Sequence, residues 1–517
     1  MNISPATLRD WIGDGQELAI LDAREEGEFG TGHLFWAVPC PLSRAELRIP
    51  VLLPRLATRI VVVDDGRGLA QRLATLLEGM GASVVHVLEG GTEAWAEAGF
   101  VLFTGVNVPS KAFGEWVEHH YGTVSVDAVD LKAWMDQGRD MVVLDSRPMD
   151  EFHRMSIPTG INVPGGELAY RIADLVPDPA TTIVVNCAGR TRSIMGAESL
   201  RRAGVPNPVV ALRNGTMGWQ LAGLDVDRGK IATYAQGRPG TAALALDRAS
   251  AFAEASGVRI IGPLDLVRFE ADPDRTLYTL DVRDPREFAV AHRPGSRNAP
   301  GGQLVQATDQ WIAVRNARIA VLDDDGVRAR MSAAWLRQMG HKDVFVVEGV
   351  LAGVLEGVEP ADASPARLPV GTAPPEAAEG ALVIDLGRSI DFRAGHIPGA
   401  IWGLRTRLAH LQARIAAAER VVITSPDGVL AAMAVDEVKA IRRMPVVALA
   451  GGTAAWTAAG RLLAIDRTDP PDEACVDFYL RPYDRNSGVE AAMQAYLSWE
   501  IDLVHEIARD GTVAFGA

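Results

Sequence analysis

Residues 142–147 read VVLDSR, and this short run recurs along the chain with little change. The related runs are AILDAR at 19–24, YTLDVR at 278–283 and a stretched form, LVIDLGR, at 382–388. Each is an apolar stretch of strand length that ends in aspartate and is followed by an arginine. An acidic residue and phenylalanine come next, as in Glu151–Phe152. Repetition on this scale indicates that the chain contains four copies of one structural unit.

The spacing inside each copy is nearly constant. The aspartate of the first run lies 42, 42, 42 and 40 positions before the residue that follows a second strand-like run. A closing residue, which is Trp95, Trp219 and Trp456 in three copies and Val354 in the third, lies another 31, 32, 31 and 31 positions on. Strand-like runs alternate with helical patterns, which predicts an α/β fold with four tandem domains, each a mainly parallel sheet flanked by helices.

The repeat sets the expected domain boundaries. The four units are expected at residues 1–104, 122–229, 257–358 and 377–468, with linkers near 105–121, 230–256 and 359–376. At about 100 residues, each unit is large enough to bury its own core. Residues 469–517 form a C-terminal tail, which should dock its helix on a domain or on a second subunit. Gly511 should end this helix, and its apolar face should carry Met493, Tyr496, Leu497, Ile501, Val504 and Ile507.

Composition narrows the classes of protein. The chain has 517 residues, 48% of them apolar, and a net charge of -15. That charge argues against nucleic acid and an anionic membrane surface as partners. No apolar run approaches the ~18 residues of a membrane span, and the N-terminus lacks a signal-peptide pattern, so we expect a cytoplasmic protein. Three scattered cysteines exclude a disulfide framework, and without metal-ligand or nucleotide-binding motifs we expect no metal or cofactor.

Cys187 is the candidate nucleophile. It follows a strand expected at 183–186, and a helix is expected from about Ser193, so residues 188–192 must form a tight loop at a helix N-terminus. Backbone N–H groups there lack intrahelical partners and can bind an anion. The helix dipole, Arg190 and Arg192 add positive charge. All of these favour the thiolate, which is the reactive form of cysteine.

With the Asp-x-Arg runs, the GHIPGA turn at 395–400, a strand ending at Cys187 and the GGxxxW turns, the chain resembles the rhodanese sulfurtransferase family. It looks most like members with four tandem modules. The resemblance implies transfer of a sulfane sulfur from thiosulfate, through a persulfide on Cys187, to cyanide or a thiol. It further implies that Ala188, Gly189, Arg190, Thr191 and Arg192 bind the donor. Asp145 and Arg147 are implied as a supporting ion pair that orients the loop.

Two other functions stay open at this stage. Four residues separate Cys187 from Arg192, whereas the related arsenate reductases and phosphatases have a loop one residue longer, which favours sulfur transfer. An arsenate reductase or phosphatase of this fold is still an alternative. The third possibility is a sulfur-carrier or interaction protein, in which Cys187 receives sulfur from a protein partner. A homodimer is also possible.

The other three units are expected to be inactive. Asp64, Asp323 and Ser425 stand where the second unit has Cys187, and all three are good N-cap residues that would occupy the anion site themselves. Asp324 and Asp325 are expected to lie inside the same cradle. Glu167 and Arg171 are candidates for the rim of the Cys187 pocket or for a solvated helix start. Cys40 is interpreted as structural, and acidic neighbours should make Cys475 a poor nucleophile.

Overall fold

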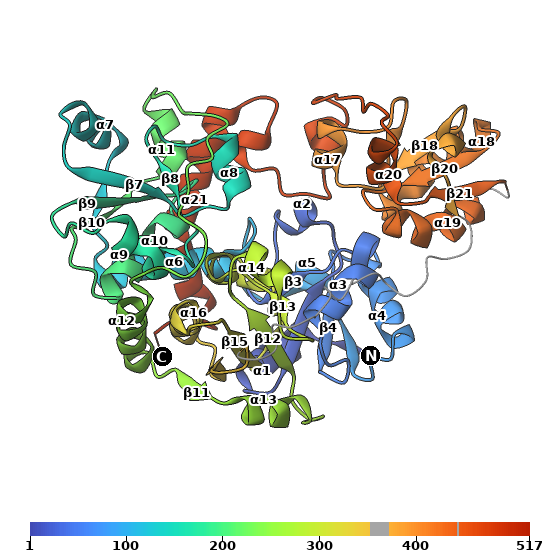
Figure 1. Cartoon of the computed structure of the whole chain (residues 1–517). Helices are drawn as coiled ribbons and strands as arrows, with labels where there is room; N and C mark the ends of the chain where they lie inside the picture. Colours follow the sequence, from blue (N-terminus) through green and yellow to red (C-terminus); the bar gives the residue numbers. More distant parts are fainter. Residues whose placement is uncertain (352–371, 442–443, 517) are drawn as a thin grey trace.

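The computed structural model describes residues 1–351, 372–441 and 444–516. Four mainly parallel sheets follow one another along the chain, each flanked by helices (Figure 1). Apart from one extra strand at the edge of the first sheet, each sheet has the same strand order: the first strand of the unit pairs with its last, and then follow the last but one, the second and the short third strand. The expected α/β architecture with four repeated sheets is therefore confirmed.

The first two units contain the following elements. The first has strands β1 (Asn2–Ile3), β2 (Leu18–Asp22), β3 (Ala37–Pro39), β4 (Ile60–Val63) and β5 (Val85–Leu88), with helices α1 (Pro5–Gly13), α2 (Glu26–Phe29), η1 (Leu42–Arg44), α3 (Ala45–Leu52), α4 (Leu69–Gly79) and α5 (Gly91–Glu97). The second has β6 (Ser125–Val126), β7 (Met141–Asp145), β8 (Ile161–Asn162), β9 (Thr182–Asn186) and β10 (Val209–Leu212), with α7 (Ala128–Asp136), α8 (Met149–Arg154), α9 (Leu168–Leu175), α10 (Thr191–Arg202) and α11 (Gly215–Leu221).

The last two units and the tail are built in the same way. The third unit has β11 (Arg259–Ile261), β12 (Leu277–Asp281), β13 (Arg297–Asn298), β14 (Val314–Arg315), β15 (Arg318–Leu322) and β16 (Val344–Val347), with α13 (Pro263–Glu270), α14 (Pro285–Val290), α15 (Gly301–Gln306), η2 (Thr308–Gln310) and α16 (Val327–Gln338). The fourth has β17 (Thr372–Ala373), β18 (Leu382–Asp385), β19 (Ile401–Trp402), β20 (Val421–Thr424) and β21 (Val446–Leu449), with η3 (Pro375–Ala378), α17 (Ser389–Ala394), η4 (Arg405–Leu411), α18 (Gln412–Ala417), α19 (Val429–Ile441) and α20 (Gly452–Ala458). The tail has η5 (Asp472–Ala474), η6 (Pro482–Asp484) and α21 (Val489–Asp510).

The first two segments between units each contain a helix. Helix α6 (Val108–Tyr121) fills the expected linker at 105–121, and α12 (Ala242–Ala255) lies in the one at 230–256. The third expected linker lies outside the described residues up to 371, as does Val354. None of the helices in the described part of the chain combines the length and the apolar character needed to cross a bilayer.

Each of the first three units buries a core of its own, as expected, and the three also share a further cluster that was not expected. One continuous cluster of buried side chains includes Leu21 of the first unit, Ile194 of the second and Val321 of the third. Strand β14 of the third unit also pairs antiparallel with β2 of the first. The physical reason is that α6 and α12 are apolar on the faces that they present to neighbouring units, so they fill the space between the sheets. The fourth unit keeps its own clusters.

The tail returns from the fourth unit to the second (Figure 1, red). Helix α21 packs on α6, with Leu503 and Ile507 buried against Phe103, while Leu497 contacts Ala188. Docking on a domain is thus confirmed, and Gly511 ends the helix in the left-handed conformation. The prediction of which residues form the apolar face of α21 was partly wrong.

Ile501 is 46% exposed, whereas Glu500 and Leu503 are buried. Glu500, which the sequence analysis did not single out, lies on the buried side because it has a cationic partner there, as described below.

The second and third units meet through paired glycines. A Cβ on Gly166, just before α9, would lie 2.9 Å from the backbone nitrogen of Gly302 in α15. Only glycine permits this approach of the two backbones. As a result α15, with Gln303 and Gln306, lies beside the carboxyl end of the second sheet, where Cys187 is found.

Candidate active site

Cys187 lies directly after β9, a central strand of the second sheet. Strand β9 pairs in parallel with β7, so that Asn186 is opposite Asp145 and both strands end at the same edge. The cysteine is 2% exposed, and its Sγ lies 3.0 Å from Ser193 Oγ. Helix α10 begins at Thr191, two residues earlier than expected. The carboxyl edge of a parallel sheet beside a helix N-terminus is a common place for a reactive group.

The loop after Cys187 offers free backbone donors. None of the N–H groups of residues 188–192 donates a hydrogen bond to another group in the described part of the chain. In the other units the residue at the cysteine position caps the following helix instead. Asp64 accepts from the N–H groups of Gly66 and Ala70 at 2.9 and 3.0 Å, Asp323 does so from Gly326 and Ala329 at 2.8 and 3.1 Å, and Ser425 accepts from Ala431 at 3.2 Å. The expectation that these residues occupy the cradle is confirmed.

The turn that contains Gly215 packs against the backbone of Cys187. The N–H of Thr216 donates to the carbonyl of Cys187 at 2.8 Å. Gly215 has a φ of +53°, and a Cβ on it would lie 2.4 Å from that same carbonyl oxygen. The same threonine contact recurs from Thr92 to Asp64 at 2.8 Å and from Thr453 to Ser425 at 3.0 Å. This contact explains why the closing turn is repeated with its glycine and threonine.

Asp145 and Arg147 form a buried ion pair next to the loop. The guanidinium donates to both carboxylate oxygens at 2.8 and 2.7 Å, and Asn186, the residue before Cys187, donates to Asp145 at 2.8 Å. Arg147 also holds the carbonyl of Met155 at 2.7 Å. The same pairs form in the first and third units, which have no cysteine at this position. Their presence there fits a scaffold role.

The fourth unit departs from this pattern. Asp385 accepts from the N–H of Gly387 and makes no ion pair with Arg388. The extra residue in LVIDLGR moves Arg388 out of reach, and its guanidinium lies 4.5 Å from the ring centre of Phe478 in the tail. Burial raises the pKa of the Asp385 carboxyl to about 6. The stretched motif is therefore not a fourth copy of the ion pair.

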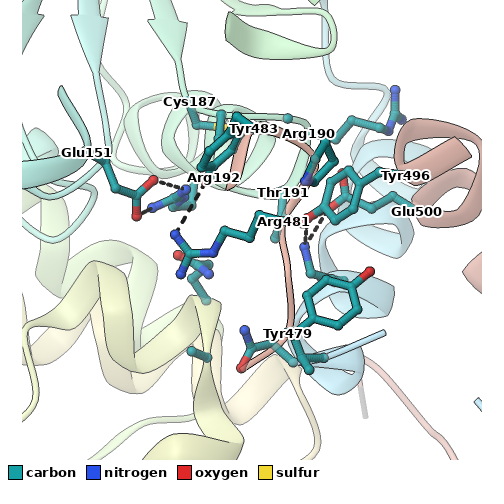
Figure 2. Close-up of a pocket in the computed structure, with 18 of the residues that line it drawn as sticks. Glu151, Cys187, Arg190, Thr191, Arg192, Tyr479, Arg481, Tyr483, Tyr496 and Glu500 are labelled. Atoms are coloured by element: carbon teal, nitrogen blue, oxygen red, sulfur yellow. Dashed lines mark hydrogen bonds and ion pairs between the residues drawn. The ribbon is translucent and has the colours of Figure 1, made fainter. Parts of the chain in front are cut away.

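Arg192 faces Cys187 and is held by Glu151 (Figure 2). The two side chains form a bidentate pair, with both N–O distances at 2.8 Å. Burial opposes charge on both groups, but the pairing outweighs it, so the pKa of Glu151 falls to about 2 and that of Arg192 rises. Arg192 therefore carries a permanent charge in a fixed position near the sulfur.

The guanidinium of Arg190, which was expected to bind the donor, contacts helix α6 instead. Its guanidinium binds Glu115 in α6 through two contacts of 2.7 Å, and also contacts Glu118 and Asn214. In Figure 2 its side chain points away from Arg192. Arg190 lines the pocket, but its donors are used to fasten the loop to α6.

A cavity of about 270 Å³ opens at Cys187, and every unit contributes to its wall. The tail is the largest contributor outside the second unit (Figure 2). Of the residues that the sequence indicated for this site, only residues 187–192 line the cavity. The polar side chains that the sequence missed are Glu26, Asn107, Lys111, Glu151, Gln303, Gln306, Gln310, Arg388, Tyr479, Arg481, Tyr483, Tyr496 and Glu500. One of these residues could have been suspected from the sequence. The extra residue in LVIDLGR separates Arg388 from Asp385, so this arginine needs another partner.

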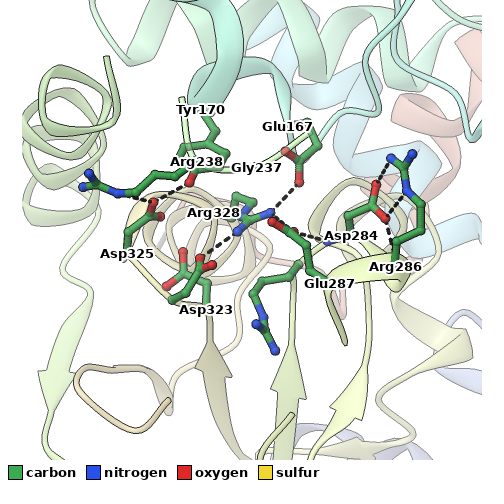
Figure 3. Close-up of polar contacts among 12 residues, drawn as sticks. Glu167, Tyr170, Gly237, Arg238, Asp284, Arg286, Glu287, Asp323, Asp325 and Arg328 are labelled. Atoms are coloured by element: carbon green, nitrogen blue, oxygen red, sulfur yellow. Dashed lines mark hydrogen bonds and ion pairs between the residues drawn. The ribbon is translucent and has the colours of Figure 1, made fainter. Parts of the chain in front are cut away.

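Glu167 and Arg171 do not line this cavity, and they are not solvated either. Both are buried, and they pair with each other at 2.9 Å. Glu167 also binds Arg328 of the third unit at 2.8 Å (Figure 3). Arg328 stands five residues after Asp323, as Arg192 does after Cys187, and it contacts Glu287 as Arg192 contacts Glu151. The two residues thus belong to the interface between the second and third units.

Asp324 and Asp325 lie close to the cradle of the third unit, with a carboxylate oxygen of each within 4.8 Å of one of Asp323, but contrary to expectation neither accepts from its N–H groups in the described part of the chain. Asp324 binds Arg328 at 2.7 Å, and Asp325 accepts from Tyr170 of the second unit and lies 3.5 Å from Arg238 (Figure 3). Asp324 is held by Arg328 of its own unit, whereas the partners of Asp325 lie outside the third unit. Only Asp323 fills the cradle.

The remaining singled-out residues have ordinary environments. Cys40 is fully buried, and burial raises its pKa to about 12. The pKa of Cys475 is also raised, by burial first and by Asp477 and Asp472 to a smaller extent. Trp95, Trp219 and Trp456, which close three of the repeats, are buried core residues. Neither Cys40 nor Cys475 has the environment of a reactive thiol.

Comparisons with known proteins agree with this geometry. The family model for the rhodanese-like domain matches residues 4–98, 127–222 and 267–356. The chain is similar to a crystal structure of thiosulfate sulfurtransferase from Pseudomonas aeruginosa, with 44% identity, a TM-score of 0.93 and 99% of each chain covered.

Two curated relatives match over shorter stretches. The HTH-type transcriptional regulator Rv0324 of Mycobacterium tuberculosis is 37% identical over 91 residues, which is 17% of this chain and 39% of that protein. The putative sulfur carrier protein YrkF of Bacillus subtilis is 31% identical over 88 residues, 17% of this chain and 46% of that protein. The chain therefore spans less than half the length of these two relatives.

Proposed function

The chain belongs to the rhodanese family, and we propose that it is a sulfurtransferase that moves a sulfane sulfur from thiosulfate, through a persulfide on Cys187, to cyanide or a thiol. The observation that carries this proposal is the position of the Cys187 sulfur at a loop whose backbone N–H groups have no other partner in the described part of the chain. A capping carboxylate or hydroxyl takes that place in the other three units. We propose a cytoplasmic location as well.

The first half of the reaction loads sulfur onto the enzyme. The Cys187 thiolate attacks the outer sulfur of thiosulfate, a new S–S bond forms, and the bond to the sulfonate sulfur breaks with its electron pair. Sulfite leaves, and no external oxidant is needed. In this proposal the N–H groups of residues 188–192, which have no other partner in the described part of the chain, bind the anionic persulfide, and the guanidinium of Arg192 lies beside it, paired with Glu151.

The second half returns the enzyme to its starting state. A nucleophilic acceptor attacks the outer persulfide sulfur, takes it as thiocyanate or as a new persulfide, and restores the Cys187 thiolate. In this proposal Asp145, Arg147 and Arg190 act by holding the loop, since their polar groups are used in contacts with the protein. Arg192 and the loop N–H groups act on the bound anion.

Mass spectrometry after incubation with thiosulfate tests this function. We expect one added sulfur atom on Cys187, its loss on addition of cyanide, and no transfer by Cys187→Ser. Cys475→Ser and Cys40→Ser are the matched controls and should keep their activity. Transfer by Cys187→Ser would contradict the assignment. Sulfur loaded only by a persulfide-bearing protein partner, with thiosulfate inert, would favour the sulfur-carrier alternative.

A further inference from the structure

The positive charges of the active-site loop are already compensated by the protein. Arg190 is bound by Glu115 and Glu118, and Arg192 by both oxygens of Glu151. Lys111, the lysine that lines the cavity, pairs with Glu500 at 2.7 Å. A dianionic donor that enters the cavity therefore finds no spare cation on the loop itself.

Two other guanidinium groups line the same cavity without such compensation. Neither Arg481 nor Arg388 has a carboxylate within ion-pair distance in the described part of the chain. Arg481 contacts the Tyr483 hydroxyl at 3.3 Å and points toward Arg192 in Figure 2, and Arg388 stacks on Phe478. Glu26 is the lining carboxylate that has no ion pair among the described residues, so the unpaired groups sum to one positive charge.

We propose that Arg481 of the tail and Arg388 of the fourth unit bind the anionic sulfur donor in front of Cys187. This inference rests on the proposed function and assigns the substrate-binding charge to parts of the chain outside the catalytic unit. Guanidinium forks suit the oxygens of a sulfonate group, because each can donate two parallel hydrogen bonds. Aromatic neighbours orient both arginines in advance, so little side-chain freedom is lost on binding. The cysteine-free fourth unit thereby completes the site.

Alkylation of Cys187 measures this charge independently of sulfur transfer. Iodoacetate is an anion and iodoacetamide is neutral. The rate of Cys187 alkylation by iodoacetate divided by the rate with iodoacetamide, both followed by mass spectrometry, therefore reports the local electrostatic potential. We expect Arg481→Gln and Arg388→Gln each to lower the ratio roughly fivefold, as one unit charge acting over several ångströms does between protein and water. Arg481→Lys should keep most of the ratio. Arg485→Gln, which removes an exposed arginine of the same tail that does not line the cavity, is the control.

Steady-state kinetics provide the second measurement. The Gln variants should raise KM for thiosulfate more than they lower kcat, because they remove binding that is similar in the ground and transition states. An unchanged rate ratio and an unchanged KM in the double variant would overturn the inference. If the parent protein fails to take sulfur from thiosulfate but the ratio still falls in the Gln variants, the proposed donor is wrong and the anion-binding role of the two arginines stands.

Discussion

Replacing Lys111 by methionine should loosen the tail from the active-site loop. Lys111 in α6 and Glu500 in α21 form an ion pair in which both side chains are buried, 8% and 2% exposed. The same Glu500 oxygen accepts from Thr191 of the loop and from Tyr496, each at 3.2 Å. One carboxylate therefore joins the tail, α6 and the loop after Cys187.

The magnitude follows from the geometry. Opposite charges 2.7 Å apart attract by about 6 kcal/mol at an effective dielectric constant of about 20, before the cost of desolvation is subtracted. Removing one partner leaves the other buried and unpaired, which costs about 3–5 kcal/mol. Removing both charges together should lower the free energy of unfolding by less than the two single changes combined, because no buried charge is then left without a partner. Lys111→Met and Glu500→Leu should each destabilise strongly, and the double variant should cost less than the sum of the two.

The assay must report on the tail itself, because a chain of four units does not unfold in one two-state step. Hydrogen exchange in α21 gives the local opening free energy, and scanning calorimetry gives Tm. The matched control is Lys132→Met, which breaks the exposed pair with Asp136 and should change stability by less than about 1 kcal/mol. Single variants as stable as this control, or a double variant that costs the full sum, would refute the reasoning.

Three further predictions follow from the ion pairs and the buried carboxylates. Arg190→Ala leaves Glu115 fully buried without its bidentate partner, so it should lower Tm by calorimetry, and an effect on kinetics alone would contradict the loop-fastening role. Asp323→Cys on a Cys187→Ser background should form no thiocyanate, because Glu167, Glu287 and Asp324 bind Arg328 and keep it from an anion. Activity near that of the parent protein would show that a cysteine alone makes a unit active. Burial raises the pKa of Asp309 from its ordinary value of 3.8 to about 7. The protonated carboxyl therefore contributes stability to the folded state that is fully present below pH 3.8 and is lost as the pH rises through about 7. Asp309→Asn should therefore raise Tm at about pH 8 and leave it nearly unchanged at about pH 4, and an equal effect at both would rule out the carboxyl's titration as the cause.

The sequence by itself determined the repeated fold and which unit has a cysteine at the uncapped loop. In the second unit the Asp-x-Arg pair contacts the end of the second long strand, and the glycine turn contacts the residue that follows that strand. Because these contacts join neighbouring strands of one sheet, constant spacing in the sequence becomes constant geometry. The identities of Asp64, Asp323 and Ser425 were therefore enough to predict three capped units, and Cys187 marks the unit whose loop N–H groups are left without a cap in the described part of the chain.

The tertiary structure alone decided which charges face the cavity. Arg190 looked like a donor contact until Glu115 and Glu118, more than 70 residues earlier in the chain, were found to bind it. Arg481 looked like an ordinary tail residue until α21 docked on α6 and brought it beside Arg192. An ion pair between distant segments leaves no periodic mark in the sequence, since it depends on how whole units pack. For that reason the local chemistry of Cys187 could be predicted from the sequence, and the composition of its cavity could not.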